Sequence, residues 1–245
     1  MGAYPTPQTA ADVLARVRRL RPRVHCLMNT VVQKFTADGI TVVGGIPSMT
    51  SSLEEIAAFA GKADALTVNL GTLDAERRRA ILRAVAVVNE AGKPWILDPV
   101  HCDYSPQRLA FAQELIALGP TIVRGNAAEM ALIGTDGPGL RIQTGAVDRI
   151  GSGKGAMRVE NGHRWMAEVT GTGCLTGGVI AAFLAVEPDA VAAAASALAV
   201  TGVAAELAAP LSRGPGSFGI AFLDALSAIG ERELLSHARI EHDQD

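Results

Sequence analysis

Short apolar runs alternate with longer amphipathic segments between residues 24 and 134, and this alternation sharply limits the possible folds. The apolar runs predict strands and the segments predict helices. The predicted strands are 24–29, 39–45, 64–71, 94–100 and 120–125, and the predicted helices are 9–20, 51–63, 74–92, 105–119 and 126–134. Such alternation forms parallel βαβ units, with both faces of the sheet buried. We therefore expect an α/β fold with a mostly parallel sheet and helices on both faces.

The alternation of strand-like and helix-like segments ends after residue 139. Four short strands are expected within 140–145, 146–153, 156–162 and 163–169, followed by two alanine-rich helices and a last helix that ends near residue 235. Two helix starts are predicted from caps, Thr9 in a capping box and Ser52. The polar tail, 236–245, is predicted to fray. Since no low-complexity linker interrupts the chain, we expect a single domain, 1–245.

Composition excludes several classes of protein. The net charge is −3, so the clustered basic surface that nucleic-acid binding requires is not expected. The long apolar region from Leu175 to Ala209 is interrupted by Glu187, Pro188 and Asp189, which predicts core helices and no membrane partner. Three scattered cysteines form no disulfide framework, and with His101 nearby they match no zinc motif. Reduced thiols predict a cytoplasmic protein.

A glycine-rich turn, EVTGTGC at 168–174, precedes the first apolar helix. The first turn of a helix has free N–H groups and a positive dipole end, and Gly171 and Gly173 allow a ligand to approach the backbone. The turn is therefore a candidate anion site, and the alternative is a plain loop entering a core helix. The segment GSGKGA at 151–156 lacks the spacing of a P-loop.

Polar residues follow several predicted strands, where parallel sheets bind ligands. Asp98 and Glu129 could hold Mg²⁺ directly or through water. Arg124 could contact phosphate, and Thr144 could hydrogen-bond a nucleotide phosphate. Each has a structural alternative: a turn for Asp98, an ion pair between Arg124 and Glu129, and a strand end for Thr144. Together these groups suit phosphoryl transfer, which depends on positioning and charge neutralisation.

These motifs, taken in order, resemble the hydroxyethylthiazole kinase family of the ribokinase-like superfamily. The resemblance covers nearly the whole chain and is carried by VHCLMNTVVQKFTADGI, GGIPSM, LTVNLGTL, LDPV, RGNAAEM, VENGHRWM, VTGTGC and GPGSFGIAFLDAL. It implies a ribokinase-like three-layer architecture. It also implies phosphorylation of the primary hydroxyl of 4-methyl-5-(2-hydroxyethyl)thiazole by Mg-ATP, in thiamine salvage.

The resemblance also implies roles for individual residues. Met49 and Gly171 match positions that contact the thiazole. Arg124 and Thr144 match positions that contact ATP, and Thr172 and Gly173 belong to the turn that would hold the transferred group. Asp98 and Glu129 match acidic positions near Mg²⁺. Family members are typically homotrimers with the substrate pocket between subunits, so Asn29 and Gln33 are candidates for the adjacent site.

Cys174 stands where many ribokinase-like enzymes have the aspartate base. Because a helix N-terminus lowers a thiol pKa, Cys174 as a thiolate could accept the hydroxyl proton. The alternative is that it only shapes the pocket, since a loose transition state needs little help from a base.

Three segments depart from the family pattern. The connection between Glu129 and Thr144, residues 130–143, is shorter than usual, so one side of the sheet could lose a covering helix. VHCDYSP follows Asp98 in place of a glycine-rich loop, and SMTSSLEE differs in the substrate region. The alternative functions are a kinase of another small alcohol and a non-catalytic thiazole-binding relative. A dehydratase of the superfamily is disfavoured because that branch carries GTGD.

Overall fold

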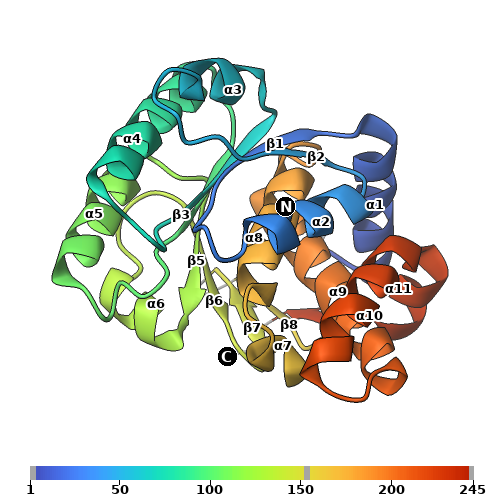
Figure 1. Ribbon diagram of the computed structural model, residues 1–245. Helices are drawn as coiled ribbons and strands as arrows, with labels where there is room; N and C mark the ends of the chain where they lie inside the picture. Colours follow the sequence, from blue (N-terminus) through green and yellow to red (C-terminus); the bar gives the residue numbers. More distant parts are fainter. Residues whose placement is uncertain (1–3, 152–154, 243–245) are drawn as a thin grey trace.

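The computed structural model describes residues 4–151 and 155–242, and within them the strands form one nine-stranded sheet (Figure 1). The strand order is β2-β1-β3-β4-β5-β6-β7-β8-β9. Neighbours from β2 to β6 are parallel, and β7 to β9 are antiparallel. The strands are β1 Arg23–Leu27, β2 Ile46–Ser48, β3 Ala65–Asn69, β4 Trp95–Asp98, β5 Ile122–Asn126, β6 Leu140–Thr144, β7 Asp148–Ile150, β8 Met157–Val159 and β9 Ile240–His242. The expected mostly parallel α/β sheet is confirmed.

Helices cover both faces of the sheet and make three layers (Figure 1). One face carries α3 Ile56–Lys62, α4 Ala75–Glu90, α5 Pro106–Ala117 and α6 Ala127–Ile133. The other carries α1 Pro7–Leu20, α2 Gln33–Val42, α8 Thr172–Leu184, α9 Ala190–Ala208, α10 Pro215–Ala228 and α11 Glu231–His237. The short helices α7 Trp165–Glu168 and η1 Ala209–Leu211 lie in connections on this second side.

The side chains of alternate strand residues are buried in two separate hydrophobic cores, one on each face of the sheet. In β4, Ile96 joins the core under α8 and α9, whereas Trp95 and Leu97 join the core under α4 and α5. All five residues of β3 are buried. This double burial explains why the central strands read as continuous apolar runs in the sequence.

The predicted strand at 39–45 is wrong. Residues 39–42 are the last turn of α2, and 44–45 form a tight turn before β2. Ile40 packs against Gly178 of α8, where an added Cβ would lie 2.9 Å from the Ile40 Cδ1. Tertiary packing of this face therefore overrides the β propensity of the Ile-Thr-Val-Val run.

Four further expectations need correction. Residues 165–168 form α7 rather than a strand. Thr6 caps α1 with Thr9 as its capping-box partner, and α3 begins at Ile56 with no side-chain cap from Ser52. The tail is not frayed over residues 240–242, because β9 pairs with β8. Residues 243–245, and 152–154 of the GSGKGA segment, lie outside the described residues.

The short connection at 130–143 still supplies cover for the sheet. Helix α6 occupies its first part, and Met130 and Ile133 join the core beside α5. Arg141 fastens the remaining loop, because its guanidinium donates hydrogen bonds to four loop carbonyls, those of Gly134, Asp136, Pro138 and Gly139, at 2.5–3.1 Å. A buried arginine thus takes the place of a longer helical crossover.

Helix α9 and the turn after it, Ala190–Leu211, are long and apolar enough to cross a membrane by length and composition. The most apolar stretch is 78% buried inside the protein, between α1, α8 and α10. It is therefore the central core helix of its layer, as the sequence predicted.

Candidate active site

A cavity of about 1070 Å³ opens at the carboxyl edge of the parallel strands. Its wall combines the segments after β1, β3, β5 and β6 with the first turn of α8. The chain leaves β1 for β2 on one side and reaches β3 on the other, so the cavity includes the point where the strand order reverses. Ligands of open α/β sheets bind at such a point.

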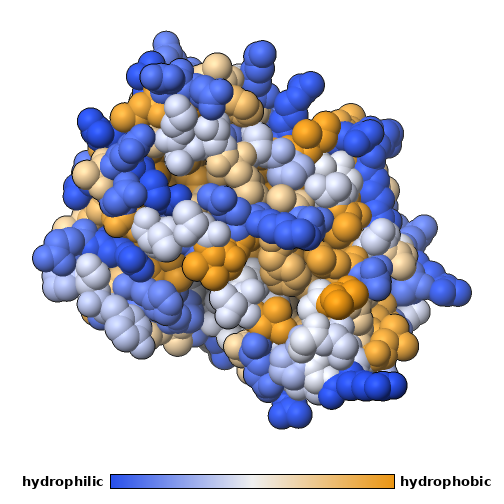
Figure 2. Space-filling model, viewed as in Figure 1, coloured by the Kyte–Doolittle hydropathy of each residue, from blue (hydrophilic) through white to orange (hydrophobic). Residues whose placement is uncertain are grey.

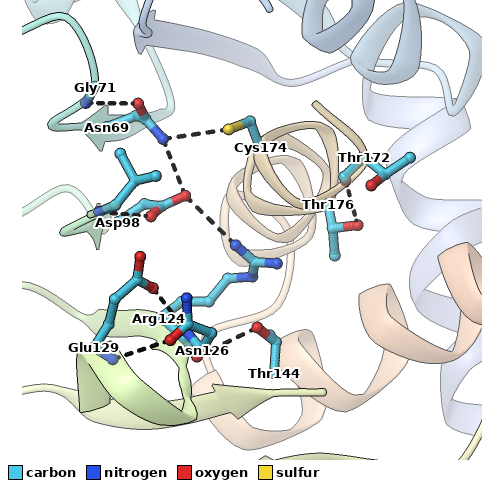
Figure 3. A network of polar contacts seen from close by, with 12 residues as sticks. Asn69, Gly71, Asp98, Arg124, Asn126, Glu129, Thr144, Thr172, Cys174 and Thr176 are labelled. Carbon is cyan, nitrogen blue, oxygen red and sulfur yellow. Dashed lines mark hydrogen bonds and ion pairs between the residues drawn. The ribbon is translucent and has the colours of Figure 1, made fainter. Parts of the chain in front are cut away.

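Two buried asparagines, Asn29 and Asn69, join this switch point to Cys174. Figure 3 shows the contacts of Asn69 with Cys174, Asp98 and Gly71. The Asn69 amide nitrogen donates to Asp98 Oδ2 at 3.1 Å and lies 3.4 Å from Cys174 Sγ. Its oxygen accepts from Asn29 Nδ2 at 3.1 Å and from the Gly71 N–H at 3.0 Å. Since two donors converge on the Asn69 oxygen, the orientation of its amide is fixed, with the nitrogen towards Asp98 and Cys174.

Arg124 is a buried cation that faces the N-terminus of α8. Its Nη1 lies 3.5 Å from Asp98 Oδ2, while its buried Nε has no hydrogen-bond partner. A Cβ added to Gly173 would lie 3.4 Å from Arg124 Nη2, so the glycine lets the guanidinium approach the helix. A cation with an unused donor beside free helical N–H groups suits a phosphate.

Glu129 and Thr144 lie at the other end of the same edge. Glu129 is the third residue of a capping box, in which its Oε2 accepts the Asn126 N–H at 2.8 Å. Its Oε1 accepts the His101 N–H at 2.7 Å. The Thr144 hydroxyl donates to the Gly125 carbonyl at 3.3 Å and borders the cavity. The side chain of Glu129 points towards Asp98 in Figure 3.

The turn before α8 is shaped for close approach. Gly171 has φ +99°, and a Cβ there would lie 2.9 Å from Val32 Cγ1, so only glycine fits. The Thr172 hydroxyl donates to the Met166 and Val169 carbonyls and is directed into the turn. The Thr172 N–H also donates to the Val169 carbonyl, at 3.4 Å, so both donors of Thr172 are engaged within the turn.

The expected lowering of the Cys174 pKa is contradicted. Burial, and then the Asp98 charge, raise the pKa of the Cys174 thiol to about 12, and these outweigh Arg124 and the two asparagine amides, which lower it. At neutral pH the side chain is a thiol, so it cannot accept a proton as a resting thiolate. Burial, opposed by Arg124 and reinforced by Glu129, also raises the pKa of Asp98.

Seven of the predicted residues line this cavity, and four do not. Asn29, Arg124, Thr144, Gly171, Thr172, Gly173 and Cys174 line the cavity, and Asp98 and Glu129 lie directly behind its wall. Met49 is half-buried and packs against the core under α8 and α9, and Gln33 opens α2. Within the described part of this single chain, neither is among the lining residues.

The sequence reasoning missed one side of the cavity. Asp148, Asn161, His163 and Arg164 line it opposite Arg108 and His101, together with Thr201 and Gly202 of α9. Asp148 accepts the Gly145 N–H at 3.0 Å and lies near Arg124, whose charge opposes the burial that raises the Asp148 pKa. The sequence signals for this side were the turn-rich composition of 145–148 and the VENGHRWM motif at 159–166, to whose residues no role was assigned.

An anion pocket at a helix N-terminus, beside a switch point with a substrate-sized cavity, defines a small-molecule kinase of ribokinase-like fold. A ribokinase-like superfamily protein from Enterococcus faecalis superposes with a TM-score of 0.57 over 93% of this chain and 96% of that chain, at 13% identity, which shows the fold alone. The hydroxyethylthiazole kinase structure from Pyrococcus horikoshii gives a TM-score of 0.91 at 32% identity, covering 97% of this chain and 100% of that chain.

The model of the hydroxyethylthiazole kinase family matches residues 14–141 and 138–232. The probable hydroxyethylthiazole kinase of Agrobacterium fabrum is 68% identical over 243 residues, 99% of each chain. The chain belongs to the hydroxyethylthiazole kinase family. The resemblance seen in the sequence is confirmed.

Proposed function

We propose that the protein transfers the γ-phosphoryl group of ATP to the primary hydroxyl of 4-methyl-5-(2-hydroxyethyl)thiazole, a step of thiamine salvage. The observation that carries the proposal is that one cavity joins two different environments. Its Asn29–Asn69–Cys174 end offers amide and thiol groups to an alcohol, and its Arg124–α8 end offers a cation and helical N–H groups to a phosphate. Family membership supplies the identity of the alcohol.

The thiazole hydroxyl is placed beside Cys174 in this proposal. Asn29 and Asn69 hold the sulfur with two N–H donors, so its own S–H is left to contact the substrate. Because the thiol is protonated at neutral pH, it orients the hydroxyl instead of removing its proton. Positioning of this kind lowers the barrier without a strong base, as a loose phosphoryl-transfer transition state permits.

Arg124 and the first turn of α8 hold the transferred phosphoryl group. The Nε of Arg124 has no hydrogen-bond partner, and its Nη2 lies next to Gly173. The Gly173 N–H completes the cradle, together with Thr172, whose own N–H is shared with the Val169 carbonyl at 3.4 Å. Thr144 contacts the nucleotide phosphates from the end of β6. These groups neutralise charge that develops on the phosphoryl oxygens.

Asp98 and Glu129 suit a magnesium ion held mainly through water. Each oxygen of Glu129 already accepts one backbone N–H, and Asp98 accepts from Val100 and Asn69, so each carboxylate has lone pairs left for hydrogen bonds to metal-bound water. Mg²⁺ normally retains several waters and would neutralise the ATP phosphates here. The donor set therefore fits the ion that the family implies.

Self-association and location are further parts of the proposal. An apolar groove of about 680 Å³ lies along α10, lined by Leu207, Leu211, Ile220 and Ala221, and Ile220 is 68% exposed. Figure 2 shows apolar side chains gathered over the α9–α10 side of this face. A homotrimer would cover such surface and could bring Met49 and Gln33 into a shared site. Three free cysteines and the use of ATP favour the cytoplasm.

The decisive assay measures ADP release from Mg-ATP with and without hydroxyethylthiazole, with the phosphorylated product identified by mass. We expect thiazole-dependent turnover that falls by about two orders of magnitude or more in Arg124→Met, since Arg124 acts on the developing charge. The matched control is Arg78→Met, because Arg78 forms an exposed ion pair with Glu114 and neither residue lines the cavity. Turnover that favours another alcohol would redirect the substrate assignment, and thiazole binding without turnover would support a binding role.

A further inference from the structure

The loop after β4, residues 100–104, carries His101 and Asp103 beside Glu129. His101 has a left-handed backbone, φ +58°, and its N–H is bonded to Glu129 Oε1 at 2.7 Å. The hydrogen bond ties the loop to the first turn of α6. It therefore holds the His101 ring close to a buried carboxylate at the cavity wall.

Three metal-ligating groups converge at this place. A ring nitrogen of His101 and carboxylate oxygens of Asp103 and Glu129 all lie within 4.8 Å of one another. Ligand atoms on opposite sides of an ion bound at about 2.1 Å are about 4.2 Å apart. His101 and Asp103 are exposed, so a small movement of their side chains closes the remaining gap.

The donors remain free to coordinate. Each Glu129 oxygen accepts a single backbone hydrogen bond, so each keeps a second lone pair. The guanidinium of Arg108, in the first turn of α5, donates to the Val100 carbonyl at 2.7 Å. The ring of Tyr104 contacts His101 edge-on, with centroids 5.3 Å apart, and restricts the swing of the imidazole.

The donor set differs in kind from the one that suits magnesium. Mg²⁺ takes oxygen ligands, whereas an imidazole with two carboxylates favours a divalent transition metal such as Mn²⁺ or Zn²⁺. Two carboxylates also balance the charge of such an ion. The group is open to solvent on the His101 and Asp103 side, so an ion can enter without nucleotide.

We propose that His101, Asp103 and Glu129 form a transition-metal site of the Mn²⁺ and Zn²⁺ class, which binds its ion before and independently of ATP. Glu129 then serves two ions, because one of its oxygens coordinates this ion and the remaining lone pair on the other is available to the water of a magnesium ion beside Asp98. The transition-metal ion would therefore bind at the edge of the proposed nucleotide pocket.

The test titrates the nucleotide-free protein with Mn²⁺ and follows the loss of the free-ion electron paramagnetic resonance signal. We expect one Mn²⁺ per chain, displaced by Zn²⁺ and not by an equal concentration of Mg²⁺. Spin-echo modulation of the bound Mn²⁺ should show one directly coordinated ¹⁴N nucleus. His101→Asn should remove the nitrogen modulation, and asparagine tolerates the left-handed backbone at this position. His101→Asn and Asp103→Asn should each weaken Mn²⁺ binding about tenfold or more.

His237→Asn is the matched control, because His237 is an exposed histidine on α11. It should leave both the affinity and the nitrogen modulation unchanged. Absence of nitrogen modulation in the wild type, or its persistence in folded His101→Asn protein, would overturn the proposal. Neither readout involves ATP or the thiazole, so the result is independent of whether the proposed phosphoryl transfer is observed.

Discussion

Asn69 provides the most direct test of the polar network behind the cavity. Its amide both donates to Asp98 and accepts from Gly71 and Asn29. Asn69→Asp has nearly the same shape and keeps the acceptor oxygen, but it replaces the donor with a second carboxylate. That carboxylate would stand about where the nitrogen lies now, 3.1 Å from Asp98 Oδ2.

The magnitude follows from two competing free energies. Two charges at 3.1 Å repel by about 5 kcal/mol at an effective dielectric constant of about 20. Keeping a proton on a carboxyl group at pH 7 costs about 4 kcal/mol, from a reference pKa of about 3.9 and about 1.36 kcal/mol per pH unit. The second cost is smaller, so the introduced carboxyl group and Asp98 should share one proton in the folded variant.

The free energy of unfolding of Asn69→Asp should therefore depend on pH. The carboxyl pKa of the variant is raised in the fold, so its proton is bound on folding and stability falls as pH rises. Relative to the wild type, we expect a loss of about 4 kcal/mol at pH 7 that shrinks by about 1.4 kcal/mol per unit down to about pH 5. Urea unfolding, followed by circular dichroism at several pH values, measures this difference.

Asn69→Ala is the matched comparison. It leaves the Gly71 N–H and the Asn29 amide without their acceptor, which costs about 1–3 kcal/mol for each buried donor, and it introduces no second carboxylate. A pH-independent difference between Asn69→Asp and the wild type would refute the close contact between the side chain at position 69 and Asp98. A loss below about 0.5 kcal/mol in Asn69→Ala would refute the buried network itself.

Four other outcomes are expected. Arg141→Met should lower stability by about 2–4 kcal/mol in urea unfolding, because four carbonyls lose a charged donor, and a loss within about 0.5 kcal/mol would contradict this function of the loop. Gly171→Ala should destabilise by about 1–3 kcal/mol from its backbone conformation alone, and an unchanged melting temperature would oppose that. Burial lowers the pKa of His25, so the stability that the neutral ring contributes is present above pH 6.5 and is lost as pH falls through the lower pKa of the folded state. In that acid range the wild type should lose up to about 1.4 kcal/mol of its free energy of unfolding per pH unit, and His25→Gln should not show this loss. Alkylation of Cys174, located by mass spectrometry, should rise about tenfold per pH unit between pH 7 and 10, and a plateau near pH 8 would show an acidic thiol.

The central strands β3 and β4 could be predicted closely, because burial on both faces gives them nearly continuous apolar sequences between turns. The error at 39–45 has the opposite origin. Its β-branched residues are also apolar, and only the partner surface on α8, at Gly178, decides that they lie in a helix. The last strand was missed because β9 is polar and is defined by its pairing with β8.

The site could be predicted in part for similar reasons. Asp98, Arg124 and the GTGC turn stand at strand ends or a helix start, which sequence patterns mark. The Asn69–Cys174 contact joins residues 105 positions apart, and the rise in the Cys174 pKa depends on how deeply the cavity wall buries the thiol. The local sequence around Cys174 shows only a helix N-terminus, from which a lower thiol pKa was predicted. It contains no sign of the contact with Asn69 or of the depth of burial.

The packing of α1 on α9 and α11 has a consequence for synthesis on the ribosome. Val13, Leu14 and Val17 are made first, yet the helices that bury them are among the last segments to leave the exit tunnel. The backbone hydrogen-bonding groups on the outer edge of β8 likewise remain unpaired until β9, residues 240–242, has been synthesised. The nascent chain can assemble its parallel strands early, but it must carry an uncovered apolar helix until translation ends. A truncated chain that stops before α9 should therefore be a strong substrate for chaperones.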